Sequence, residues 1–346
     1  MTQAGIPHPR TAARLRFVAR PKKIFGAALL LGCVFFPSAG VLQAQVARPA
    51  SPPAAAPQVT LARHYQDGAQ IAYTINCFNQ ARAKTTAYEA RAEGVVRKDA
   101  SGAFVEDLAW TDLNVNDEQV RLSAASRAFR EPLSLAPGAK LSLPSLSGVQ
   151  PALLDPISDL LTFYADLKIA MNQHSLTRAG DHAYVPYGAP ISWADGKHVI
   201  LGQDAVDFDV TLQSIDPATQ IATLVIRHVP PAQPQIKLPA PWMIESGRSE
   251  RAGNSANNWV QVEKTPDGKY IAGVGQETFE VRIRIALATG RIDSATLDNP
   301  VTVSERACTD EALTACGAPE RYTLGRQITL RADPTPALAP TQAPAH

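Results

Sequence analysis

The sequence has few aromatic side chains, few cysteines and none of the common catalytic signatures. Phe, Trp and Tyr together make up 6% of its 346 residues, and there are four cysteines. It contains no HExxH metalloprotease motif, no GxSxG nucleophile elbow and no Walker phosphate loop. The sequence therefore gives no support to the enzyme classes that these motifs define, and we expect no cofactor.

Acidic residues are absent from the first 45 positions, which carry six Arg or Lys. Removing these six from the 33 basic residues leaves 27 against 32 acidic residues, a net charge of −5 for the rest of the chain. Nucleic-acid-binding proteins carry a basic surface that neutralises phosphates. A mildly acidic body lacks that surface, so we expect no nucleic-acid partner.

The basic cluster precedes an apolar run, 24–36, which a Pro-Ser pair ends. A positive start, an apolar stretch and small residues near Ala44 are typical of an export signal. Residues 1–45 are therefore predicted to be a signal peptide or membrane anchor. Three versions stay open: cleavage near Ala44, lipidation at Cys33, or retention of 24–44 as an anchor. All three predict an exported protein, periplasmic or extracellular, that meets the membrane only through this segment.

Two Pro/Ala-rich tracts bound the predicted folded part. Residues 46–60 and 332–346 each contain four prolines. Such tracts favour extended polyproline conformations and cannot build a core. We therefore expect a linker at 46–60, a single β-rich domain at 61–331 and a disordered tail at 332–346.

Alternation of apolar and polar residues dominates the predicted domain. It is clearest at 279–287, and 206–213 repeats it; this period of two is typical of half-buried strands. Turn sequences such as Thr-Pro-Asp-Gly at 265–268 separate the runs, which predicts antiparallel hairpins. We expect a mainly β fold of about a dozen strands in an antiparallel curved sheet, half-barrel or sandwich-like. Less regular strands are predicted at 69–78, 85–98, 104–115, 119–129 and 321–331.

One hairpin allows its register to be predicted. A three-residue loop at 217–219 would place Leu212 opposite Leu224 and, on the other face, Asp209 opposite Arg227. An even-length loop would set each apolar face against the wrong neighbours. We therefore predict the odd loop and an Asp209–Arg227 cross-strand pair.

One segment departs from the alternating pattern. Asp155 is predicted to be a helix N-cap, with Pro156 at the first helical position. Apolar residues then recur at intervals of three and four as far as Met171. The sequence predicts one principal helix at about 155–172. Antiparallel strands curling around a single long helix behind an export signal resemble, in architecture and without a shared motif, the half-barrel carriers of lipids and lipoproteins.

The space between the sheet and this helix is the predicted binding site, because apolar walls and a few polar groups would converge there. The candidate ligand-binding residues are Leu160, Tyr164 and Leu167 on the helix and Trp242 beside a proline-rich segment. The leading interpretation is a non-catalytic binding or carrier protein. Its partner would be a hydrophobic small molecule or another envelope component.

Two other functions stay open. Asp207 and Asp209 project to one side of a strand as candidate metal ligands, and Asp195 and His198 lie in a nearby loop. Oxygen-rich clusters hold cations, and Asp/His pairs serve as general acids and bases. These four residues would serve an extracytoplasmic hydrolase or metal-dependent enzyme, although aspartates on a strand are also typical of a solvated face. The third possibility is a tethered structural or adaptor module.

The cysteines of the body fit an oxidising compartment. Cys308 and Cys316 bracket seven residues whose ends can meet, which predicts a disulfide. Cys77 alternates with Tyr73 and Ile75, which predicts a buried thiol on a strand face. A bridge from Cys77 to one of the other two stays open.

Overall fold

The computed structural model describes most of the region after the first Pro/Ala-rich tract. The predicted export signal lies outside the described residues, as do all but the ends of the two Pro/Ala-rich tracts. The described residues are 58–141, 145–186, 191–194, 198–203, 206–229, 240, 242–243 and 257–333.

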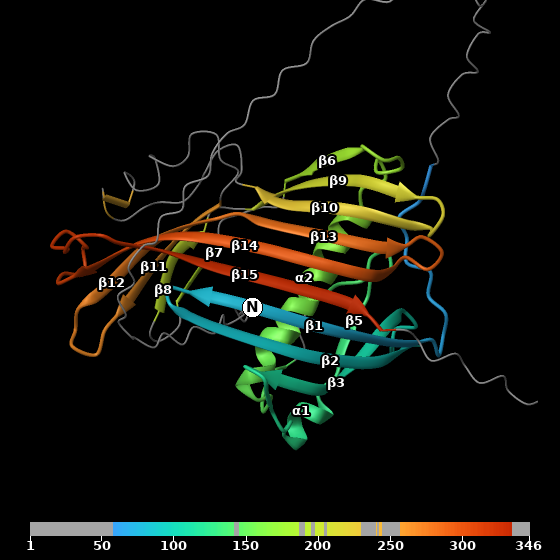
Figure 1. The fold of residues 1–346 in the computed structure, drawn as a ribbon, viewed down its shortest axis with the longest axis horizontal. Helices are drawn as coiled ribbons and strands as arrows, with labels where there is room; N and C mark the ends of the chain where they lie inside the picture. The colour runs from blue at the N-terminus through green and yellow to red at the C-terminus, as the bar shows by residue number, and fades with distance from the viewer. Residues whose placement is uncertain are drawn as a thin grey trace, which may run out of the picture. The chain divides into compact units, whose positions relative to one another are not determined.

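The described chain forms an open, curved antiparallel sheet of 15 strands with one main helix (Figure 1). The mainly β prediction is confirmed. The strands are β1 (Gln70–Ala81), β2 (Lys84–Lys98), β3 (Phe104–Val115), β4 (Glu118–Gln119), β5 (Glu131–Leu133), β6 (His182–Val185), β7 (Ile191–Ala194), β8 (His198–Gln203), β9 (Asp207–Asp216), β10 (Ile221–Val229), β11 (Asn257–Lys264), β12 (Tyr270–Glu277), β13 (Phe279–Ala286), β14 (Arg291–Cys308) and β15 (Glu320–Ala332). The helices are α1 (Ala124–Ala128) and α2 (Leu154–Met171).

Strands β12 and β13 run as one continuous strand beside β14. Glu277 pairs with Val301 and Glu280 with Asp298, so the register is unbroken across Thr278. On the other side, β12 pairs with β11 whereas β13 pairs with β10. The sheet therefore divides at Thr278 into a branch of β11, β8 and β7 and a branch of β10, β9 and β6. We call this point the fork.

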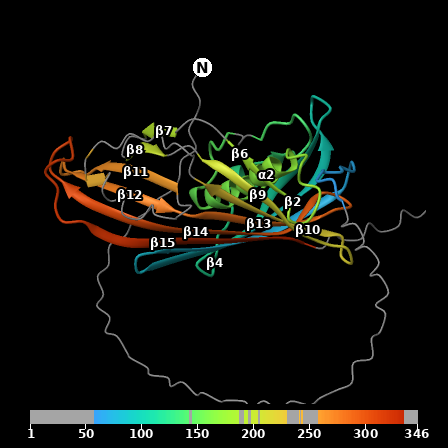
Figure 2. The ribbon, with the colours of Figure 1, turned by 90° about the horizontal axis from the view of Figure 1, so that it is seen from above.

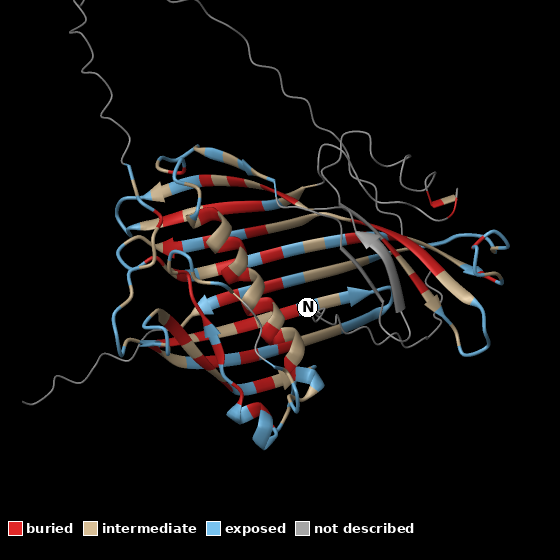
Figure 3. Ribbon diagram, turned by 180° about the vertical axis from the view of Figure 1, so that it is seen from behind, coloured by how far each residue is buried: buried red, intermediate tan, exposed pale blue. Residues whose placement is uncertain are grey.

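The main core lies between α2 and one face of the sheet, which we call the helix face. Figure 2 shows α2 on one side of β13, β14 and β15, and Figure 3 shows buried residues along the strands beneath it. Ile75, Ile283 and Leu297 on the strands, and Leu160 and Leu167 on the helix, are fully or almost fully buried in one hydrophobic cluster. This burial is the main source of stability, at about 1.5–3 kcal/mol for each large apolar side chain.

A second, smaller core lies on the outer face of the sheet, beyond the fork. On β14, Leu297 and Val303 alternate onto the helix face, whereas Cys308 has the opposite parity. Ala272 and Val274 on β12 are in register with that opposite face and pack in one cluster with Cys308. Beyond the fork, the sheet therefore buries side chains on its outer face as well.

Helix α2 begins one residue before the predicted start. The chain already turns in a 3-10 helix at Pro151–Leu153, so Leu153 holds the N-cap position and makes no side-chain cap. The prediction of Asp155 as the N-cap was wrong. Asp155 instead lies in the first turn, where its negative charge interacts favourably with the positive end of the helix dipole. Pro156 is tolerated there because the backbone N–H groups of the first turn have no acceptor within the helix.

The strand predicted at 119–129 was also wrong. Strand β4 has two residues, and α1 follows it. The Ser123 hydroxyl accepts a hydrogen bond from the Ser126 N–H and caps α1. The capping hydrogen bond therefore favours a helix in this segment, where the period-two pattern had suggested a strand.

The hairpin of β9 and β10 has the predicted register but not the predicted loop. Leu212 lies opposite Leu224, and Asp209 opposite Arg227. The turn takes four residues, 217–220, and a register shift between Thr223 and Leu224 restores the pairing of like faces. Arg227 forms its ion pair with Glu280 on the other neighbouring strand, at 2.8 Å.

The cysteine predictions hold. Cys308 and Cys316 form a disulfide, and Cys77 is a buried free thiol on β1. A bridge from Cys77 to either of the other two is therefore excluded. Within the described part of the chain, no helix has the length and apolar character needed to cross a membrane.

Candidate functional site

Helix α2 is bound to the sheet by buried polar contacts at three points along its length. At the first, the Asp159 carboxylate accepts hydrogen bonds from the Tyr88 hydroxyl on β2 and from Arg326 Nη2 on β15, the latter at 2.5 Å. Burial raises the pKa of Asp159 to about 6, although the Arg326 charge opposes this shift. Burial also raises the pKa of the neighbouring Cys77 thiol to about 11, so this thiol is protonated at neutral pH.

The second point is a chain of buried groups at the middle of α2. The Tyr164 hydroxyl donates to Glu106 on β3 and lies 3.0 Å from the Tyr73 hydroxyl on β1. Glu106 also accepts from Arg63 Nε at 2.7 Å, and both side chains of this ion pair are almost fully buried. Burial raises the pKa of Tyr73 to about 12, so its hydroxyl is neutral at physiological pH.

The third point joins α2 to β10. His228 Nε2 lies 3.1 Å from both carboxylate oxygens of Asp166, which is buried. The imidazole stacks on Phe279 at 4.1 Å between ring centroids and meets the edge of Phe208 at 4.7 Å. His228 is therefore a histidine held in a fixed orientation at the edge of the core.

These contacts define what surrounds the predicted ligand-binding residues of the helix. Leu160, Tyr164 and Leu167 are buried against the sheet in the main core. A ligand placed between helix and sheet would have to displace direct hydrogen bonds at three points. Asp159 and Asp166 stand seven residues apart, two turns along one side of the helix, and this spacing is a sequence signal that could have identified them.

Trp242 lies with a different group of residues. Its indole N–H donates to Leu313 O at 3.2 Å, and the Arg306 guanidinium lies 5.0 Å from its ring centroid. It packs against the outer-face core that contains Cys308. The structure thus brings the three helix residues together and places Trp242 in the second core.

The candidate metal ligands on β9 have partners on β6. Asp207 accepts a hydrogen bond from the Tyr184 hydroxyl, and Asp209 Oδ1 lies 2.7 Å from His182 Nε2. Among the residues that the structure describes, no group of three His, Cys, Asp or Glu side chains is placed to hold a metal ion. Asp195 lies outside the described residues, and the side chain of His198 is not described.

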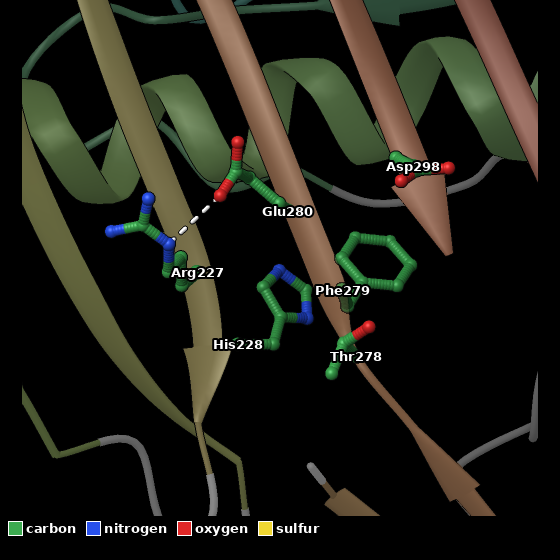
Figure 4. Close-up of a pocket in the computed structure, with 6 residues that line it drawn as sticks. All are labelled: Arg227, His228, Thr278, Phe279, Glu280 and Asp298. Carbon is green, nitrogen blue, oxygen red and sulfur yellow. Dashed lines mark hydrogen bonds and ion pairs between the residues drawn. The ribbon is translucent and has the colours of Figure 1, made fainter. Parts of the chain in front are cut away.

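A pocket of about 290 Å³ lies at the fork, where β10 ends beside Thr278. Figure 4 shows its charged side chains on three neighbouring strands, with an aromatic ring, an imidazole and a hydroxyl toward the strand ends. Its volume is just below the range of about 300–1,000 Å³ for small-molecule sites. The residues that line it are Arg227, His228, Thr278, Phe279, Glu280 and Asp298.

Two of the three charged groups of the fork pocket, Arg227 and Glu280, form an ion pair with each other. Arg227 Nε donates to Glu280 Oε2 at 2.8 Å, and Arg282 Nη2 donates to Glu280 Oε1 at 3.1 Å. Asp298 lies directly opposite Glu280 in the sheet, and its Oδ1 is 3.5 Å from Gln327 Nε2. The Asp166–His228 contact holds the imidazole and Phe279 on the helix face, whereas Arg227, Glu280 and Asp298 project from the outer face of the same strands.

Sequence reasoning did not find this pocket, because it depends on which strands lie beside 277–280. The one local signal is Pro300 in the middle of β14, where proline is unusual in a strand paired on both sides. Pro300 O accepts from the Thr278 N–H at 3.1 Å, so this proline marks the fork.

No protein-family model matches the chain, and comparison with curated proteins finds no match. A proposal for the function therefore rests on the fold and the fork pocket.

Proposed function

We propose that the protein is an exported, non-catalytic binding protein whose ligand occupies the fork pocket. The observation that carries this proposal is the fixed geometry of the pocket walls. The Arg227–Glu280 ion pair orients the charged groups on the outer face of the sheet, and the contact of His228 with buried Asp166 orients the imidazole on the helix face. Pockets with fixed walls and a few oriented polar groups are typical of small-molecule sites, because little entropy is lost on binding.

The export signal expected from the sequence and the Cys308–Cys316 disulfide support an extracytoplasmic location. The chemistry of the lining favours a polar envelope component over a long acyl chain. Three of the six lining residues carry a formal charge, and covering them with an apolar chain would cost solvation without a hydrogen bond in return.

The test is native mass spectrometry of the purified protein after exposure to a small-molecule extract of its own cell envelope. We expect an adduct that is released on collisional activation, together with a polypeptide mass that reports the state of residues 1–45. The Arg227→Gln variant should lose the adduct. The Arg284→Gln variant is the matched control, because Arg284 pairs with Asp293 outside the pocket, and it should keep the adduct.

Two results would overturn the proposal. One is the absence of any adduct on the wild-type protein. The other is equal adduct formation by the wild type and the Arg227→Gln variant, which would place the ligand elsewhere.

A further inference from the structure

We propose that β5 and the turn after it, residues 131–139, form a flap that the proton on Glu131 holds against the main core and that loosens when this proton is lost. The inference is independent of the fork pocket, because the flap pairs with β3 and contacts α2. Three observations carry it: a buried carboxyl group with one unbonded oxygen, the lack of a counter-charge beside it in the described part of the chain, and the limited pairing of β5.

The side chain of Glu131 is fully buried, and one of its two oxygens is bonded. Oε2 accepts a hydrogen bond from Trp110 Nε1 at 3.1 Å, whereas Oε1 has no partner among the residues that the structure describes. A buried carboxylate needs hydrogen bonds or a cation to replace its hydration. The surroundings of Glu131 supply one donor, so they favour the protonated carboxyl. Burial accordingly raises the pKa of this group well above its usual range.

Charged side chains on the surrounding elements do not compensate a negative charge at Glu131. These side chains are Glu106 on the same face of β3, Asp155, Asp159, Asp166 and Lys168 on α2, and Arg127 and Arg130 just before β5. Among these described groups, none contributes to the pKa shift of Glu131: burial raises this pKa, and the hydrogen bond from the Trp110 indole lowers it. Loss of the proton would therefore leave a buried anion without a cation beside it.

The flap is joined to the sheet by few backbone pairs. Within the described sheet, β5 pairs with β3 alone, over three positions, and its central residue, Pro132, has no N–H to donate. The turn that follows is bound to α2 by Lys168, whose ammonium group donates to three of its backbone oxygens. Short edge segments of this kind open locally at a lower free energy than the whole domain.

Opening of the flap is linked to pH through Glu131. In the open flap the carboxyl is hydrated and has its ordinary pKa of 4.5, whereas in the closed flap its pKa is raised. The contribution of Glu131 to closure is therefore fully present below about pH 4.5 and is lost as pH rises toward the raised pKa. Across that interval the equilibrium constant for opening rises about tenfold per pH unit, because one proton is released. Leu133 and Leu135 belong to the main core, so opening exposes part of that core.

The test is hydrogen–deuterium exchange of the purified protein at pH 5, 6, 7 and 8. Mass spectrometry follows peptides that cover 127–135, and the rates are corrected for the pH dependence of unprotected amides. We expect the opening constant of this segment to rise about tenfold per pH unit in the wild type and to stay level in Glu131→Gln, which cannot ionise. The matched control is Glu118→Gln, the same change at an exposed position on β4, which should keep the wild-type slope. Peptides from β13 report opening of the whole domain and should exchange at least tenfold more slowly at each pH.

Three results would overturn the proposal. An opening constant that does not change between pH 5 and 8 in the wild type, or one that rises equally in Glu131→Gln, would show that opening is independent of the Glu131 proton. Equal exchange in the 127–135 and β13 peptides would show that the flap opens only with the whole domain. If the Gln variant does not fold, Glu131→Met, which also lacks a titratable group, takes its place in the same comparison.

Discussion

The hydroxyls of Tyr73 and Tyr164 lie 3.0 Å apart where α2 lies against β1. Their rings meet edge to face, with planes at 88°, and the Tyr164 hydroxyl continues to Glu106 and from there to Arg63. Apolar packing alone would let a helix slide along a sheet, whereas this chain of buried hydrogen bonds is satisfied at one position. Polar contacts therefore specify where α2 sits, and apolar burial supplies most of the free energy.

The first prediction concerns the middle of that chain. Tyr164→Phe keeps the ring and removes the hydroxyl, which leaves Glu106 and Tyr73 each without one buried partner. We expect a loss of about 1–3 kcal/mol in the free energy of unfolding, measured by urea titration. The control is Tyr184→Phe, whose hydroxyl also meets a carboxylate but whose side chain is half exposed; it should change stability by no more than about 0.5 kcal/mol. Equal losses in the two variants would contradict the role assigned to the buried chain.

The second prediction concerns pH. The pKa of Asp159 rises from 3.8 in the unfolded chain to about 6 in the folded protein because burial disfavours the charged form. Folding therefore favours the protonated carboxyl. The stability that it contributes is fully present below about pH 4 and is lost as pH rises through 6, with a slope of at most about 1.4 kcal/mol per pH unit. Carboxylates with a lowered pKa, such as Asp181 and Asp216, titrate below this window.

Asp159→Asn should remove this slope. Unfolding free energies measured at pH 5, 6 and 7 should fall more steeply for the wild type than for the variant. Parallel curves would mean that Asp159 is already ionised in the folded protein at pH 5, with Arg326 outweighing burial.

The third prediction contrasts two buried glutamates. Glu106 forms an ion pair with buried Arg63, so Glu106→Gln leaves a cation without its counter-charge and should cost about 3–5 kcal/mol. Burial raises the pKa of Glu131 well above its usual range, and its Oε2 accepts from Trp110 Nε1 at 3.1 Å. Burial thus favours the neutral form of Glu131, and the Glu131→Gln variant, which is also neutral, should cost no more than about 1–2 kcal/mol. Urea midpoints at pH 7 test this order, and a reversed order would contradict the contrast drawn between the two glutamates.

The fourth prediction concerns the turn between β13 and β14. Gly290 has a φ of +64°, and a Cβ placed on it would lie 1.8 Å from Ala62 O. Gly290→Ala should therefore destabilise the protein by roughly 2–4 kcal/mol, from backbone strain together with the clash. Gly268 has a φ of +81° with open space around it, so Gly268→Ala isolates the backbone term of about 1 kcal/mol. Thermal unfolding of both variants checks the difference, and similar shifts would show that residues 62–64 move aside.

Apolar residues that recur every two positions, or every three to four positions, predicted the parts of the fold in which one face is apolar. Strands β9, β10 and β13 and helix α2 are of this kind, because the residues that recur as apolar in the sequence are the ones that are buried in the structure. Residues 119–129 misled the same reasoning, because Val120, Leu122 and Phe129 suggest a strand while Ser123 supplies a helix cap. A short apolar run does not distinguish the two.

The candidate site was beyond this reasoning for a different reason. Asp159 and Arg326 are 167 positions apart, and Asp166 and His228 are 62 apart. One sequence carries no signal that links such positions, because their pairing follows from the order of strands in the sheet. The fork could not be predicted for the same reason. In the sequence Thr278 resembles any other strand residue, and only the pairing of β12 with β11 and of β13 with β10 makes it the point of division.

The unbroken course of β12, Thr278 and β13 beside β14 limits how the chain can be divided. Both branches of the sheet take their inner backbone partners from this one hairpin. A truncation that removed either branch would leave a length of the hairpin as a bare edge, and bare edges recruit other chains into aggregates. We therefore expect a fragment that stays monomeric to retain both branches.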